Sequence, residues 1–150
     1  MTDQNVDVSI VLPVLKKIPL FAELDEDLHN QIIQHIVLMY YPEDYSLFKE
    51  GEGGDALYIV KKGTVQIFNE PSEEGDLPKR VAEITEGGFF GEMALVSDVP
   101  RNASAKTLEE SEIFILSKGD FKKLLDTNTA LAEQISSTVV SRLHDNDNQG

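Results

Sequence analysis

The feature that most constrains the fold is a change of hydrophobic periodicity at Val37. Beyond it, short runs rich in β-branched and aromatic residues alternate with turn-forming stretches such as "GEGGD" at 51–55. Because no helical repeat separates the first of these runs, the strands are expected to pair antiparallel, in a sandwich or a barrel. The sequence predicts seven strands, at residues 37–41, 45–49, 56–61, 64–69, 80–85, 103–108 and 111–116.

The residues before this change have helical character. Three apolar residues share one helix face through their i, i+4, i+8 spacing: Leu28, Ile32 and Ile36. Acidic residues at 25–27 precede this face, where negative charge favours a helix start. Two prolines interrupt the earlier stretch, so the sequence predicts a short helix at about 10–17 and a turn at 18–21.

Helical signals return after the last strand. Ser117 and Asp120 have the spacing of a capping box, and an apolar face follows within residues 118–126. The chain can break near 127–129 and then restart as a second helix. That helix carries an apolar stripe every four residues: Leu131, Ile135, Val139 and Leu143.

Bulk properties exclude several classes of function. The formal net charge of −14 repels nucleic acid and anionic membranes, so neither is an expected partner. With no cysteine, the chain has neither disulfides nor thiolate chemistry. The N-terminal apolar run at 8–15 is too short to span a bilayer and lacks a basic flank, so we expect a cytoplasmic protein without membrane insertion.

An enzyme is not expected. The three histidines (His29, His35 and His144) all lie outside the predicted strands, so a metal site inside a small barrel is not expected. A nucleophile-elbow motif is also missing from the sequence. We therefore expect no catalytic residue and no metal.

Residues 87–105 place two charged side chains, Glu92 and Arg101, in an apolar stretch. A short helix starting after Gly91 would offer backbone N–H groups to a phosphate. The Glu92 carboxylate would repel a phosphate but suits ribose hydroxyls. The Arg101 guanidinium can bind two phosphate oxygens at once. The pattern therefore predicts a ligand with one phosphate beside a ribose, which describes a cyclic nucleotide.

The stretch "FGEMALVSDVPRNASA" at 90–105 closely resembles the phosphate-binding cassette of cyclic nucleotide-binding domains, the cAMP- and cGMP-binding β-barrels of catabolite activators and protein kinase regulatory subunits. "GDALYIVKKGTVQIF" at 54–68 and "LKKIPLF" at 15–21 resemble further parts of that family, and the likeness covers roughly residues 12–144. The resemblance implies a jelly roll (double-stranded β-helix) with N-terminal helices, a short phosphate-binding helix and two C-terminal helices. It also implies a cAMP- or cGMP-binding regulatory domain.

The resemblance assigns roles by position. Glu92 would accept a hydrogen bond from the ribose 2′-hydroxyl, and Arg101 would bind the cyclic phosphate. Four residues would complete the phosphate cradle with their backbone: Gly91, Met93, Ala94 and Ala103. Leu124 or Leu125 would form an apolar hinge in a helix at 118–126. The stripe from Leu131 through Ile135 and Val139 to Leu143 would form a lid.

These expectations divide the chain into an N-terminal helical segment (1–36), a β-barrel (37–116) containing the cassette (87–105), hinge and lid helices (117–144) and a disordered tail (145–150). Ligand occupancy would move the C-terminal helices and so signal to an effector protein or an attached output domain. The stripe also makes a homodimer plausible.

Other interpretations stay open at this stage. Glu92 and Arg101 could pair with each other, and Leu124 and Leu125 could be ordinary core residues. The stripe fits a lid, a dimer seam or plain packing equally well. Asn102 differs from the residues common at its position in cAMP- and cGMP-selective kinase domains. The choice between the two nucleotides therefore stays open, with cAMP favoured over cGMP. A degenerate barrel acting as a protein-interaction scaffold is the alternative function.

Overall fold

The computed structural model describes residues 6–71 and 73–149, with side chains described as far as residue 139. Two helices come first, α1 (Val8–Leu15) and α2 (Glu26–Ile33). Eight strands follow: β1 (Val37–Tyr41), β2 (Ser46–Phe48), β3 (Ala56–Lys62), β4 (Val65–Asn69), β5 (Lys79–Ile84), β6 (Phe89–Phe90), β7 (Ser104–Thr107) and β8 (Ser111–Ser117). A 3-10 turn, η1 (Glu92–Leu95), lies between β6 and β7, and the chain closes with α3 (Lys118–Thr127) and α4 (Thr129–Gln149).

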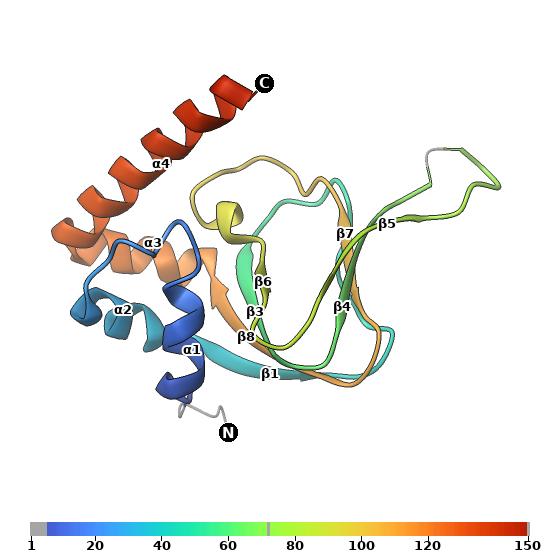
Figure 1. Cartoon of the computed structure of the whole chain (residues 1–150), viewed down its shortest axis with the longest axis horizontal. Helices are drawn as coiled ribbons and strands as arrows, with labels where there is room; N and C mark the ends of the chain where they lie inside the picture. Colours follow the sequence, from blue (N-terminus) through green and yellow to red (C-terminus); the bar gives the residue numbers. More distant parts are fainter. Residues whose placement is uncertain (1–5, 72, 150) are drawn as a thin grey trace.

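The strands form two antiparallel four-stranded sheets, ordered β1-β8-β3-β6 and β2-β7-β4-β5. In Figure 1, α1, α2 and α3 pack at one end of the sheets, and α4 runs outward beyond them. This arrangement confirms the predicted mainly β, jelly-roll class with flanking helices. Within the described residues the strands form two separate sheets and not one closed barrel.

All seven predicted strands are present, each within one residue of its expected bounds. The additional strand, β6, has only two residues, too short for its period to be read from sequence. Gly63, in the turn between β3 and β4, has a positive φ of 105°. A Cβ on Gly63 would lie 2.2 Å from Ser111 Oγ, so the turn also requires a residue without a side chain.

The helices differ from prediction mainly at their ends. α1 starts two residues before the expected 10–17 because the Asp7 carboxylate caps it, accepting from the Ser9 N–H at 3.0 Å. Pro13 lies inside α1 rather than breaking it. Ile36 lies beyond the end of α2 but is still buried.

At the C-terminal end the predicted start of α3 is confirmed, because Ser117 Oγ accepts from the Asp120 N–H at 3.1 Å. The predicted break at 127–129 separates α3 from α4. α4 continues to Gln149, through most of the stretch expected to be a disordered tail, since neither proline nor glycine interrupts it before Gly150. Leu143 falls outside the described side chains.

β3 is buried on both faces and separates two hydrophobic cores. The helical core joins α1, α2, α3 and α4 to one face of β3 and β8; its members include Leu15, Phe21, Ile32, Leu57, Ile59, Phe114, Phe121 and Leu131. The inter-sheet core lies on the other face; its buried members are Ala56, Tyr58, Val60, Val65, Ala105 and Ile113. Across the described part of the chain, every helix is too short or too polar to cross a membrane.

Candidate functional site

The segment between β6 and β7 begins at Gly91, which has a φ of 81° and precedes η1. A Cβ on Gly91 would lie 2.8 Å from Arg101 Nη1 and 2.9 Å from the Ala56 carbonyl oxygen. Both the left-handed backbone and the close approach therefore require glycine. Ala94 and Leu95 of η1 are buried, which fixes this turn against the sheet.

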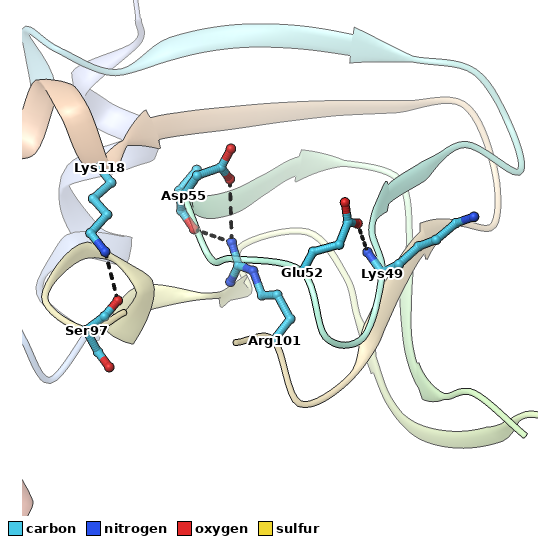
Figure 2. Close-up of polar contacts among 7 residues, drawn as sticks. Lys49, Glu52, Asp55, Ser97, Arg101 and Lys118 are labelled. Atoms are coloured by element: carbon cyan, nitrogen blue, oxygen red, sulfur yellow. Dashed lines mark hydrogen bonds and ion pairs between the residues drawn. The ribbon is translucent and has the colours of Figure 1, made fainter. Parts of the chain in front are cut away.

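The second half of the segment is held by the loop between β2 and β3. The Arg101 N–H donates to the Glu52 carbonyl at 2.7 Å, and the Gly51 N–H donates to the Arg101 carbonyl at 2.8 Å. Gly53 and Pro100 form an isolated β-bridge. Inside the loop, the Lys49 N–H donates to Glu52 Oε1 at 2.5 Å (Figure 2). Backbone contacts thus set the position of Arg101.

The Arg101 side chain is only 8% exposed. Its Nη2 donates to the Ala56 carbonyl at 3.1 Å and lies 3.9 Å from Asp55 Oδ1, so its ion pair is with Asp55 (Figure 2). Its Nε is buried and has no hydrogen-bond partner among the described residues. Burial lowers the pKa of Arg101, and the nearby Tyr58, Asp55 and Glu52 partly oppose that shift.

A cavity of about 250 Å³ opens beside the guanidinium. Its lining includes Gly91, Glu92, Met93, Ala94, Arg101 and Asn102, together with Gly54, Ser97, Val99 and Pro100. The structure therefore brings together six of the seven residues predicted to bind a ligand. Ala103 is buried and does not line the cavity. The Asn102 side chain is exposed, and the Asn102 backbone carbonyl oxygen accepts from Asn69 Nδ2 at 3.0 Å.

A larger hollow of about 1050 Å³ lies elsewhere, between residues 40–43 and 109–112. Glutamates dominate its charged lining, with Lys62 as the only basic residue. Such a surface would repel a phosphate. The smaller cavity, with its buried guanidinium, is therefore the better anion site.

The predicted hinge and lid residues pack in the helical core. Leu124, Leu131 and Ile135 are buried, while Leu125 and Val139 are partly buried against the same core. A third cavity, of about 460 Å³, lies between the end of η1, α3 and α4, and Leu125, Ile135 and Val139 line it. In this structure the described part of the stripe thus faces the core and this third cavity. Its role as a lid stays a prediction.

Lys118, the first residue of α3, connects the helices to the site. Its Nζ donates to the Ser97 carbonyl at 2.9 Å (Figure 2). The same Nζ forms an ion pair with Asp98. Its N–H donates to the Asp55 carbonyl at 2.7 Å. Lys118 holds the pKa of Asp98 below its usual value.

Four residues at or beside the site were missed by sequence reasoning: Phe48, Asp55, Asp98 and Lys118. Phe48, Asp55 and Lys118 lie far from Arg101 in the sequence, so no local spacing could connect them to it. Asp98 is close to Arg101 in the sequence, but its ion-pair partner, Lys118, is not. Only the glycines of 51–54 carried a signal, because such a cluster often marks a close backbone approach. Across the described residues there is no group of three or more side chains able to hold a metal ion.

Comparison with known proteins gives a consistent result. The family model described as "Cyclic nucleotide-binding domain" matches residues 38–128, more than half of the chain. The cyclic AMP receptor protein of Thermus thermophilus is 29% identical over 133 residues, which cover 89% of this chain and 61% of that protein. The cAMP-dependent protein kinase regulatory subunit of Emericella nidulans is 32% identical over 111 residues, covering 74% of this chain and 26% of the subunit.

Among solved structures, the regulatory domain of Toxoplasma gondii PKA with cAMP superimposes with a TM-score of 0.67 at 26% identity, covering 77% of this chain and 43% of that one. The chain thus spans less than two thirds of each of these three relatives. Family model, relatives and fold agree, and the match includes η1 and the Arg101 segment. The chain belongs to the cyclic nucleotide-binding domain family.

Proposed function

We propose that this protein is a sensor that binds cAMP in preference to cGMP and transmits ligand occupancy through its C-terminal helices. The observation that carries the proposal is the Arg101 guanidinium, which is almost fully buried at a cavity wall and whose Nε has no hydrogen-bond partner within the part of the chain that the structure describes. Burying a cation without full hydrogen bonding is costly. A bound phosphate would supply the missing acceptor and charge.

The ligand roles follow from where each group lies. Arg101 would bind the cyclic phosphate against the narrow space left by Gly54 and Gly91. Glu92, which lines the same cavity, would accept a hydrogen bond from the ribose 2′-hydroxyl. The cavity of about 250 Å³ is slightly below the ~300–1,000 Å³ typical of small-molecule sites. The base would therefore extend toward the mouth, near Val99 and Asn102.

The preference for cAMP is supported by the names of the relatives, which include a cyclic AMP receptor and cAMP-dependent kinase subunits. Asn102 is exposed at the cavity, where its amide can both donate to and accept from a purine edge. Selectivity between the two nucleotides would be set at this position.

Coupling to the helices is supported by the contacts of Lys118 with Ser97 and Asp98. A ligand that repositions this segment would change these contacts and shift the balance between two arrangements of α3 and α4. The size of the shift cannot exceed the difference in ligand affinity between the two arrangements.

The output would be an effector protein or an attached domain, because this chain covers only part of its longer relatives. A homodimer through α4 is part of the same proposal, as is a location in the cytoplasm. The alternative is a scaffold that keeps the fold without binding nucleotide. A scaffold would show no change of melting temperature with ligand, whereas a binder gains RT ln(1 + [L]/Kd).

Titration calorimetry with cAMP and cGMP tests the proposal. We expect binding of cAMP, weaker binding of cGMP, and a loss of affinity of about 1.5–3 kcal/mol in Arg101→Ala. Arg80→Ala is the matched control, because Arg80 lies on β5 with 64% of its side chain exposed and should bind like the wild type. If the folded wild type bound neither nucleotide at millimolar concentration, the proposal would be wrong.

A further inference from the structure

We infer that Phe48 is a positioning residue of the nucleotide site: its ring supports the Arg101 guanidinium from behind and sets the direction in which it faces the cavity. The Arg101 Cζ lies 4.1 Å from the centre of the Phe48 ring and 5.8 Å from that of Tyr58. Phe48 is not part of the cavity lining, so a ligand would touch the guanidinium and not the ring. This inference rests on the proposed function.

The guanidinium needs such support because its other contacts are few. Among the described residues it has one backbone hydrogen bond, from Nη2 to the Ala56 carbonyl, and its Nε has none. Its ion pair with Asp55 spans 3.9 Å, and the Asp55 side chain is 82% exposed, so solvent weakens it. The face of an aromatic ring attracts a cation most strongly where water is excluded, as it is here.

Two glycines also lie close to the guanidinium. A Cβ on Gly91 would lie 2.8 Å from Nη1, and a Cβ on Gly54 would lie 3.3 Å from Nε. The guanidinium therefore occupies a slot formed by an aromatic ring and by backbone without side chains. Such a slot leaves room for few alternative rotamers.

The ring of Phe48 is itself held in place. Its centre lies 5.7 Å from that of Tyr58 and 6.0 Å from that of Phe90, and Tyr58 and Phe90 stack on each other at 5.0 Å. On the neighbouring strand β7 the residue paired with Phe48 is Ala105, whose small side chain leaves space for the ring. The aromatic cluster, with rings from both sheets, thus restricts the position of the guanidinium.

The consequence for binding is preorganisation. When Arg101 is ordered before the ligand arrives, binding does not have to restrict a long flexible side chain. Replacing Phe48 by an aliphatic residue keeps the apolar core but removes the aromatic face. Arg101 then samples more conformations, and affinity falls although no ligand contact has been deleted.

Calorimetry with cAMP on four proteins tests the inference. We expect Phe48→Leu to weaken binding about 5- to 30-fold and Phe48→Tyr to stay within about twofold of the wild type. Phe68→Leu is the matched control, since it removes the same kind of ring from β4 in the same sheet, where the cation at the ring is Lys106 and not Arg101. It should bind within about twofold of the wild type. Equal affinity of folded Phe48→Leu and wild type would overturn the inference, as would an equal loss in Phe68→Leu.

A second measurement needs no ligand and no Phe48→Leu protein. The chain contains three arginines, so the arginine Nε–H region of its NMR spectrum is simple, and Arg101→Lys assigns the relevant signal. We expect the Arg101 Nε–H proton to be shifted upfield by the Phe48 ring, and the shift to persist in Phe48→Tyr. An Arg101 signal at its ordinary position in the wild type would overturn the inference. If the wild type bound neither nucleotide while this signal was shifted, the proposed function would fail but the slot would stand.

Discussion

The two faces of β3 support cores of different character. Toward the helices, Leu57 and Ile59 enter a large core whose clustered buried members are all apolar. Toward the other sheet, Tyr58 and Val60 enter a small aromatic core beside the buried guanidinium of Arg101. The helical core contributes stability through burial, whereas the inter-sheet core lies beside a buried charge at the wall of the proposed binding site. Stability and binding should therefore respond to different substitutions.

The largest effect is expected in the helical core. Phe121 is fully buried and packs against Phe21 with ring centres 5.7 Å apart. Phe121→Ala should lower the free energy of unfolding by about 3–5 kcal/mol, because it leaves a cavity that the core cannot refill. Urea denaturation measures this loss. Where the variant is still folded, its affinity for cAMP should be close to that of the wild type.

Arg101 provides the opposite case. Arg101→Met should reduce cAMP affinity about 10- to 150-fold, the equivalent of ~1.5–3 kcal/mol. The free energy of unfolding should not fall, and can rise, because an incompletely compensated buried cation is replaced by an apolar side chain of similar length. Urea denaturation gives the free energy of unfolding and calorimetry gives the cAMP affinity, both on the same sample. If Arg101→Met lost stability and affinity together, the two cores would not differ in the way described.

The inter-sheet core should also be sensitive to alkaline pH. Burial raises the pKa of Tyr58 from 10.0 to about 12. Between these values the unfolded chain releases the tyrosine proton while the native protein keeps it, so stability decreases as pH rises above 10. The loss from Tyr58 at pH 11, one pH unit above the unfolded pKa, should be on the order of 1 kcal/mol.

Tyr58→Phe removes this group and should make the stability curve flatter between pH 9 and 11. Urea denaturation of both proteins across this range provides the comparison. Identical pH profiles for wild type and variant would show that Tyr58 does not contribute.

The smallest effect is expected at the connection between the site and the helices. Asp98 is almost fully exposed, so its ion pair with Lys118 adds little to stability. Lys118→Met should change the melting temperature only slightly and should reduce the ligand-induced change in hydrogen exchange of α3. The part of the stability difference that comes from the ion pair should disappear at acid pH, since the ion pair is lost as pH falls through the lowered pKa of Asp98. The part that comes from the Ser97 hydrogen bond should remain. Unchanged coupling in hydrogen exchange would show that α3 responds by another route.

The sequence was sufficient for much of this fold because its signals were local. Alternating apolar runs and glycine-bounded turns located seven strands, and Ser117 located the start of α3. The cavity-lining residues from Gly91 to Asn102 followed from one continuous motif. Phe48 and Lys118 could not be found in this way, because they meet Arg101 and Asp98 only after two sheets and a helix have packed.

Asp55 has two different neighbours. Its carboxylate faces the cation of Arg101, and its carbonyl oxygen accepts the N–H of the residue that begins α3. One residue therefore contacts both the wall that would receive a phosphate and the helix that would report it. A displacement of the Asp55 backbone would reach α3 across a single hydrogen bond.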